Sequence, residues 1–341
     1  MIPGDGVPSL RWGVIGTGIA KRFVRAVRSH TSQRITAVAA RDLPRTRNFA
    51  VEHGIETVHH PPSALISDPA VDVVYVATPH SLHCDLALEA IAAGKHVLIE
   101  KPIAMSAEEA RRITAVGRAS NVLVMEAMWT RYLPQSDIIR QVLGSGALGE
   151  IHRVTAAFGF RAPTASDHRL WNPQLGGGAL LDAGIYPVSF ASSILGTPCS
   201  ISALGAVAPT GVDERADMLL SHVGGASALL STSLRSVLPG GASIVGSQGR
   251  VEVGSPFWGP SSVSFISGGL FNERKLEWHD DRHPTLHESL CYQATAFAAY
   301  VAEGRVESPL HPHEEVISIM ETLDEARRQV ATQDSARECE Y

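Results

Sequence analysis

Cysteine is scarce in this chain, with four among 341 residues. Cys84, Cys199, Cys291 and Cys339 lie far apart in sequence and include no Cys-x-x-Cys pair. Neither a disulfide framework nor a cysteine zinc site is therefore indicated. A reducing, cytoplasmic compartment suits such a composition.

An excess of basic residues and long apolar runs are also missing. Asp and Glu number 35 against 29 Lys and Arg, and this mildly negative balance argues against a nucleic-acid or anionic-membrane partner. No apolar run approaches the roughly 20 residues that span a bilayer. The stretch from Met1 to Leu10 lacks the basic and apolar regions of a secretory signal.

A metal site is not indicated either, although the chain has 15 histidines. His59-His60 and His311-Pro312-His313 lack the i, i+4 spacing of helical zinc ligands and have no companion carboxylate at a telling position. We therefore predict no metal ligands.

A strand, a glycine turn and a helix follow one another near the start of the chain. Arg11 to Ile15 is mostly apolar, Gly16-Thr17-Gly18 forms the turn, and Ile19-Ala20 open a helix. One glycine permits the tight turn, and the next lets a pyrophosphate approach backbone N–H groups at the helix N-terminus. Lys21 stands where this dinucleotide fingerprint usually has glycine or alanine.

The end of the second strand, Ile35 to Ala40, bears on which dinucleotide binds. Arg41 follows the strand and Arg45 lies one helical turn beyond. Two arginines suit a 2′-phosphate, so we predict NADP, with NAD as the alternative. Asp42 would accept the free ribose diol if the register slipped by one residue; otherwise it caps the helix beginning near Pro44.

A third chemical signal follows the strand Val97 to Ile99, which ends in Glu100-Lys101-Pro102. Open α/β sheets place ligands at such strand ends, where an ammonium can polarise a reacting oxygen. A surface lysine after an edge strand is the alternative. Strands alternating with helices predict a doubly wound parallel (Rossmann) sheet, and the ends of four of its strands should face one crevice: Gly16, Arg41, Thr78 and Glu100.

The pattern changes at about Tyr132, after which strands dominate. They predict a large, mostly antiparallel open sheet, covered on one face by helices and on the other by a second subunit. We expect a cofactor-binding domain over residues 1–130, a substrate-binding and dimerisation domain over 131–332, and a frayed polar tail over 333–341. The strands are expected at 151–160, 201–206, 218–223, 226–234, 242–245, 250–253 and 262–266.

The helix from Gly178 to Leu195 carries a further candidate pair. Asp182 and Tyr186 are four residues apart and so share one helix face. A carboxylate and a phenol projecting together can orient a substrate hydroxyl and exchange its proton. A capping aspartate and a packed tyrosine are the alternative.

Together these motifs resemble the glucose-fructose oxidoreductase, inositol dehydrogenase and rhizopine-catabolism (Gfo/Idh/MocA) family over nearly the whole chain. The stretches at 39–43 and 125–131 most resemble the dimeric dihydrodiol dehydrogenases and the NADP-dependent D-xylose dehydrogenases. The motifs that carry the resemblance are Gly16-Thr17-Gly18, Ala77-Thr78-Pro79-His80, Glu100-Lys101-Pro102 and Gly177-Gly-Ala-Leu-Leu-Asp182-Ala-Gly-Ile-Tyr186.

The resemblance implies an oxidoreductase that moves hydride between a cyclic alcohol, either a trans-dihydrodiol or an aldose sugar, and NADP. Lys101 and Tyr186 would be the catalytic pair, with Asp182 holding the substrate. His80, Trp129 and Phe158 match pocket-lining positions. The cofactor would contact Gly16, Thr17, Gly18, Ile19, Ala20, Arg41, Arg45, Thr78, His80, Glu100 and Lys101. The subunits would form a homodimer or homotetramer through the C-terminal sheet.

The proton acceptor of that pair stays open. Lowering a phenol pKa from about 10 to a working 7.5 to 8 takes roughly 3 kcal/mol. One ammonium at about 4 Å and an effective dielectric constant near 20 supplies about 4 kcal/mol. With Lys101 beside it, Tyr186 could therefore act as the proton acceptor. The alternative is that Lys101 itself accepts the proton.

Two other functions remain possible from the sequence. One is a sugar oxidoreductase of the glucose-fructose type, whose cofactor never leaves. The other is a non-catalytic NADP sensor, which the joint presence of Lys101, Asp182 and Tyr186 disfavours because a sensor has no use for a proton-transfer pair.

The arginine assignment makes a direct prediction. Arg41→Ala should weaken NADP binding about tenfold or more, because a charge-assisted bond to the 2′-phosphate is lost, while NAD binding is spared. Titration of both cofactors by fluorescence measures this. Equal losses for NADP and NAD would refute the assignment.

Overall fold

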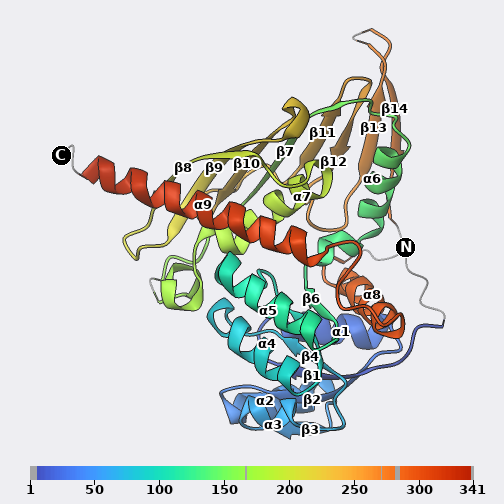
Figure 1. Ribbon diagram of the computed structural model, residues 1–341, viewed down its shortest axis with the longest axis vertical. Coiled ribbons are helices and arrows are strands. Elements are labelled where there is room, and N and C mark those ends of the chain that lie inside the picture. The colour runs from blue at the N-terminus through green and yellow to red at the C-terminus, as the bar shows by residue number, and fades with distance from the viewer. Residues whose placement is uncertain (1–5, 166, 270, 281–284, 339–341) are drawn as a thin grey trace. The chain divides into compact units, whose positions relative to one another are not determined.

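The structure, a computed structural model, describes residues 6–165, 167–269, 271–280 and 285–338. It divides into two compact units (Figure 1). The first comprises Met1–Leu133 with His283–Val316, and the second comprises Pro134–Arg282 with Ile317–Tyr341. The chain therefore returns late to its first unit, which differs from the two consecutive domains expected.

The first unit is the expected doubly wound parallel sheet. Its strands lie in the order β3-β2-β1-β4-β5-β6 and all neighbours run parallel. Their carboxyl ends therefore share one edge of the sheet, as predicted. The strands are β1 (Arg11–Ile15), β2 (Arg34–Ala39), β3 (Thr57–His59), β4 (Val73–Val76), β5 (His96–Ile99) and β6 (Val124–Glu126). The helices among them are α1 (Ala20–His30), α2 (Leu43–His53), α3 (Pro62–Ile66), α4 (His83–Ala92) and α5 (Ala107–Ala119).

An aromatic cluster explains the late return. Trp12 of β1 is fully buried, and its ring centroid lies 5.6 Å from that of Phe23 on α1 and 5.0 Å from that of Phe297. Phe297 belongs to α8 (Cys291–Ala302). Burial of this helix completes the core of the first unit, which the sequence alone could not assign to either half.

The second unit is built on an eight-stranded sheet in the order β14-β13-β12-β11-β7-β10-β9-β8. Every neighbouring pair is antiparallel except β7 and β10. The mostly antiparallel prediction is thus confirmed. The strands are β7 (Ile151–Gly159), β8 (Ser200–Val207), β9 (Asp213–Ser221), β10 (Ser227–Ser233), β11 (Ala242–Gly246), β12 (Gly249–Val253), β13 (Val263–Ser267) and β14 (Arg274–Trp278).

The edge strand β14 was not expected from the sequence. Its first four residues, Arg-Lys-Leu-Glu, are all exposed, so it lacks the alternation of a half-buried strand. It is held instead by its backbone pairing with β13. An edge strand rich in charge also resists pairing with other chains.

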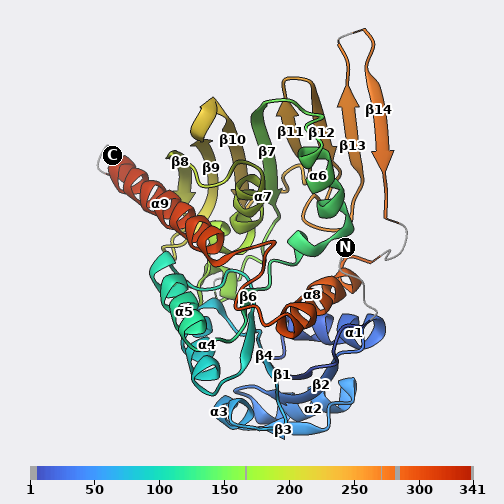
Figure 2. The same cartoon turned by 45° about the vertical axis from the view of Figure 1, so that its right-hand side comes forward.

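Helices cover one face of the eight-stranded sheet. α6 (Pro134–Gly144), α7 (Ile185–Leu195) and the part of α9 (His313–Glu338) that belongs to the second unit lie on the same side in both views (Figures 1 and 2). α7 is preceded by a π-helical turn, Leu180–Gly184. This arrangement matches the expected sheet with helices on one face.

Two expectations about helices need correction or comment. The chain stays helical to Glu338, where a frayed tail was expected from residue 333. Pro173–Leu195 is, among the described residues, a helical stretch long and apolar enough to cross a membrane, but 72% of its apolar window is buried. Such burial is typical of the core helix of a soluble protein, where helix packing replaces lipid.

Candidate functional site

The glycine turn after β1 has the form that a dinucleotide pyrophosphate requires. Gly16 has φ +112°, and a Cβ there would lie 2.2 Å from the Ala77 carbonyl oxygen. A Cβ on Gly18 would meet nothing within 4 Å, so the backbone is open to a ligand. The first turn of α1 has no acidic residue and no side-chain cap. Its N–H groups therefore suit a phosphate.

The atypical Lys21 does not disturb this turn. Lys21 is exposed, whereas Ala20, one place earlier, is fully buried. Ala20 thus allows the close helix–strand packing that the third small residue of the fingerprint usually allows. The residues of this unit fit a bound nicotinamide dinucleotide.

At the end of β2, Asp42 caps α2. Its Oδ1 accepts a hydrogen bond from the Arg45 N–H at 2.9 Å, which was the alternative role proposed for this residue. The Arg41 and Arg45 side chains are exposed and have no partner among the described residues. Two guanidinium groups are therefore available for an anion at this strand end.

Glu100 and Lys101 follow β5, and the carboxylate is enclosed. Glu100 is buried, accepts a hydrogen bond from the Tyr75 hydroxyl, and accepts the Lys101 N–H at 3.3 Å. Burial raises the pKa of Glu100, although the Tyr75 hydroxyl and the Lys101 charge act to lower it. Lys101 is thus not a surface lysine on an edge strand, because β5 lies between β4 and β6.

A buried histidine joins two of the expected contact segments. His83 lies with Nε2 3.0 Å from the Thr78 carbonyl oxygen and Nδ1 2.9 Å from that of Pro102. Burial lowers its pKa. The ring of His80 packs edge-on against it, with centroids 5.6 Å apart. Thr78, His80 and the Lys101 segment therefore gather at one edge of the sheet, and no sequence motif marked His83.

The helix that carries Asp182 and Tyr186 is fixed at its start by a buried carboxylate. Asp213 Oδ2 accepts the Leu180 N–H at 2.6 Å. Gly178 has φ +122°, and a Cβ there would lie 2.5 Å from Asp213 Oδ1. Burial raises the pKa of Asp213 to about 6, although the backbone N–H bonds act to lower it.

Tyr186 lies in an aromatic cluster. Its ring centroid is 5.6 Å from that of Phe158 on β7 and 5.8 Å from that of Trp258, and the latter two are 4.6 Å apart. The structure therefore brings the expected Phe158 and Tyr186 together. Trp258 was missed, although a tryptophan between Phe257 and Gly259 in a loop is a recognisable binding signal.

A buried glutamine fixes the loop that carries Trp258. Gln135 Nε2 donates to the carbonyl oxygens of Phe257 and Gly259 at 3.2 and 2.5 Å, and its Oε1 accepts the Ser261 N–H at 2.9 Å. Three bonds from one side chain to the loop backbone hold both sides of Trp258. The aromatic cluster is therefore preorganised.

Asp182 is also paired. The Arg169 Nη2 lies 3.0 Å from Asp182 Oδ1; the aspartate side chain is 10% exposed and the arginine side chain 51%. Gly177 allows this approach, because a Cβ there would lie 2.5 Å from the Leu170 carbonyl oxygen. An acceptor and a donor side by side suit two neighbouring hydroxyls. No periodicity marked Arg169, which lies in a short 3₁₀ turn.

The remaining expected residues have simple positions. Trp129 is buried in a 3₁₀ turn directly after β6, in the first unit. Lys101 belongs to the first unit, and Asp182 and Tyr186 belong to the second. No cluster of three His, Cys, Asp or Glu that could hold a metal occurs among the residues the structure describes.

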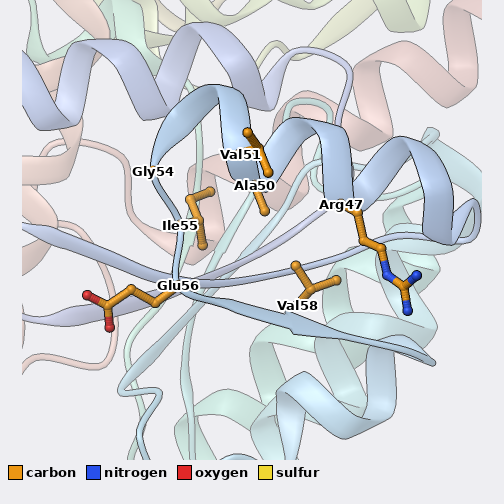
Figure 3. A pocket seen from close by; sticks show the side chains of 7 residues that line it. All are labelled: Arg47, Ala50, Val51, Gly54, Ile55, Glu56 and Val58. Atoms are coloured by element: carbon orange, nitrogen blue, oxygen red, sulfur yellow. The ribbon is translucent and has the colours of Figure 1, made fainter.

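A shallow groove lies elsewhere on the first unit, away from the expected site residues. It is formed by α2, the segment that follows it and β3 (Figure 3). Apolar side chains line its middle, and none of the expected site residues contributes to it. Its lining consists of Arg47, Ala50, Val51, Gly54, Ile55, Glu56 and Val58.

Comparison with known protein families matches both halves of the chain. Residues 10–128 match the oxidoreductase family with an NAD-binding Rossmann fold, and residues 137–252 match the GFO/IDH/MocA C-terminal domain. Trans-1,2-dihydrobenzene-1,2-diol dehydrogenases are similar along nearly their whole length. The Mus musculus protein is 36% identical (94% of this chain, 97% of the relative), and the Homo sapiens protein is 34% identical with the same coverage.

Solved structures agree with this fold. A 3-ketoreductase from Actinomadura kijaniata, in complex with NADP and TDP-benzene, superposes with a TM-score of 0.83 at 28% identity, covering 95% of this chain and 98% of its own. A levoglucosan dehydrogenase in complex with NADH and levoglucosan has a TM-score of 0.86 at 20% identity, covering 96% and 98%. The latter similarity supports the fold alone.

The Asp213 cap predicts a pH dependence of stability. The folded-state pKa of about 6 lies above the unfolded value of 3.8, so the stabilisation by this group is present below pH 4 and is lost as pH rises through about 6. The loss is on the order of 3 kcal/mol. Asp213→Asn removes it, so the melting temperature of the variant should rise relative to that of the wild type between pH 4.5 and 7.5.

Asp72→Asn is the matched control. Hydrogen bonds from Arg11 lower the pKa of Asp72, so its stabilisation is lost only in more acidic solution. The difference between that variant and the wild type should stay constant from pH 5 to 7.5. A constant difference for Asp213→Asn as well would contradict the buried-carboxylate account.

Proposed function

Because this chain belongs to the Gfo/Idh/MocA oxidoreductase family and is an NAD(P)-dependent dehydrogenase acting on CH–OH groups, we propose that it oxidises a cyclic trans-diol with NADP. The observation that supports this choice is the surroundings of Tyr186. Phe158 and Trp258 offer flat apolar faces, and Asp182 with Arg169 offers an acceptor and a donor for two adjacent hydroxyls. Relatives 33–36% identical are named trans-1,2-dihydrobenzene-1,2-diol dehydrogenases.

We assign the role of proton acceptor to the Tyr186 phenolate, and the charge that stabilises this anion to the Lys101 ammonium. The substrate hydroxyl would give its proton to the phenolate oxygen of Tyr186, and NADP, when bound, would supply the acceptor for the hydride from the same carbon. Asp182 orients the second hydroxyl, and Arg169 holds the Asp182 carboxylate. His80 and Trp129 are assigned to the substrate pocket as well. A lysine and a tyrosine are also the residues replaced in variants of the Actinomadura ketoreductase that were crystallised with NADP.

The cofactor assignment follows from the first unit. We propose that the backbone of Gly16, Thr17, Gly18, Ile19 and Ala20 holds the pyrophosphate, and that Thr78, His80, Glu100 and Lys101 lie along the nicotinamide half. Arg41 and Arg45, which lack side-chain partners among the described residues, would hold the 2′-phosphate. NADP is preferred to NAD because Asp42 is already engaged as a helix cap.

We propose a homodimer, or a homotetramer containing it, in the cytoplasm. The face of the eight-stranded sheet away from α7 carries small hydroxyl side chains and the exposed Leu204, Leu219 and Leu229, which are 60, 45 and 42% exposed. Charges of both signs flank them, for example Arg215 and Asp217 on β9. Such a face is complementary to a second copy of itself about a two-fold axis.

A substrate panel tests the activity. NADPH absorbance should rise with a cyclic trans-diol at a kcat/KM at least about tenfold above that with D-xylose or D-glucose. A preference for a sugar would replace the diol by an aldose, and transfer between two sugars without released NADPH would indicate a retained cofactor. No turnover with any polyol would refute the proposed activity.

Two variants test the roles in the pair. Tyr186→Phe should lower kcat about 10²- to 10⁴-fold, because the general base is lost. Lys101→Met should move the acidic limb of the pH–rate profile for oxidation to higher pH, because the charge that favours the phenolate is removed. Tyr300→Phe, a buried tyrosine of α8, is the control and should keep the wild-type rate. A near-normal rate for Tyr186→Phe would move the proton to Lys101.

The dimer is tested by size. Light scattering on a sizing column should give twice the chain mass for the wild type and one chain mass for Leu219→Glu, because a buried unpaired carboxylate is costly. Val51→Glu, at an 84% exposed position of the first unit, is the control. A monomeric wild type would contradict the proposed assembly.

A further inference from the structure

A row of buried charges lies behind the Lys101 segment. The row consists of Glu126 at the end of β6, His311 and Glu315 near the start of α9, and Arg131 in the turn after β6. Glu126 Oε2 lies 2.7 Å from His311 Nε2, and His311 Nδ1 lies 3.3 Å from Glu315 Oε2. Arg131 Nη2 donates to Glu315 Oε1 at 2.5 Å. The side chains of Glu126 and His311 are 1 and 0% exposed.

The charges in this row alternate in sign. Burial and the nearby Arg131 oppose a positive charge on His311, yet the two carboxylates outweigh them and its pKa is raised. Burial acts against ionisation of Glu315, but His311 and Arg131 lower its pKa to about 2. His313, two residues further, faces Glu307 and the Val124 carbonyl and carries a lowered pKa. Because both ring nitrogens of His311 face carboxylate oxygens, the geometry favours the imidazolium form of His311.

The row is connected to Lys101 through the backbone. The second oxygen of Glu126, Oε1, accepts the Ile103 N–H at 2.8 Å. On the other side of the same segment, His83 contacts the Pro102 carbonyl. The two residues that follow Lys101 are therefore fixed from both sides. Glu126 and Lys101 also both act electrostatically on the buried Glu100.

We propose that Glu126 is a positioning residue for Lys101 and that His311 holds Glu126 and balances its charge. Glu126 has two oxygens and uses one for the backbone after Lys101 and the other for His311. Loss of either contact frees the segment that orients the ammonium. This inference rests on the proposed role of Lys101 in the reaction, and it adds two residues, distant in sequence, that neither motif nor spacing indicated.

Kinetics of three variants test it. Glu126→Gln keeps an oxygen for Ile103 but loses the charge, and His311→Gln keeps a donor for Glu126 but loses the imidazolium. Each should lower kcat at least about tenfold, with KM for NADP within twofold of the wild type. His313→Gln is the matched control, because His313 is equally buried and bonds to the same strand, β6, without touching Glu126.

A second measurement does not depend on turnover. The chain has four lysines, Lys21, Lys95, Lys101 and Lys275, so ¹³C-dimethylation yields few lysine NMR signals, and Lys101→Arg identifies that of Lys101. Its titration midpoint should fall in Glu126→Gln and rise in His311→Gln, each by roughly half a pH unit, because a negative and a positive charge are removed respectively. His313→Gln should leave it unchanged.

The outcomes separate the two proposals. Opposite shifts of the Lys101 signal without turnover in the wild type would support the positioning role and refute the proposed reaction. Turnover in the wild type with an unmoved Lys101 signal and unchanged kcat in Glu126→Gln and His311→Gln would overturn the positioning role. If Glu126→Gln and His311→Gln only lowered the melting temperature, by as much as His313→Gln does, and left kcat and the Lys101 signal unchanged, the row would be a stabilising cluster and the positioning role would be overturned.

Discussion

Buried carboxylates that accept backbone N–H groups fix the segments on which the proposed chemistry depends. Glu126 accepts the N–H of Ile103 behind Lys101, and Asp213 accepts that of Leu180 ahead of Asp182 and Tyr186. Removing a carboxylate from water costs free energy, and hydrogen bonds from such donors offset that cost. The cost is visible at Asp213, because burial raises the pKa of its carboxyl group to about 6. In each unit, a buried carboxylate that accepts a backbone N–H group thus positions a candidate catalytic residue.

Glycines occupy the positions where a side chain would block the approach of these carboxylates and of the neighbouring backbone. Gly178 leaves room for the Asp213 carboxylate, and Gly177 leaves room for the backbone of Arg169 and Leu170. The glycine run at 176–178 therefore does more than begin a helix. It lets Arg169 approach Asp182, so that the run determines which polar groups stand near Tyr186.

Local patterns predicted much of the fold, because burial and turn chemistry are written in short stretches. The strand, the turn at Gly16 and Gly18, the cap at Asp42 and the sheet of the first unit all follow from neighbours in sequence. The family and its dehydrogenase activity, expected from the motif around Lys101, are confirmed by the comparisons. β14 was missed because its side chains are exposed and its pairing is by backbone alone.

The site residues divide in the same way. Motifs marked Lys101, Asp182 and Tyr186, whose roles stay predictions, whereas Trp258, Arg169 and His83 depend on contacts between distant segments. Glu126 and His311 are 185 residues apart, and no periodicity links them. Such pairs are set by the tertiary fold, and a single sequence does not report them.

The contact between Trp12 and Phe297 has a consequence for synthesis on the ribosome. The first strand emerges at the beginning of translation, but the helix that covers its tryptophan is made almost at the end. During translation, the aromatic surface around Trp12 in the first unit therefore stays uncovered until the second sheet has been synthesised. Contacts of such long range are slow to form and leave apolar surface open to aggregation, so we expect this chain to depend on chaperones in the cell more than a protein with two consecutive domains.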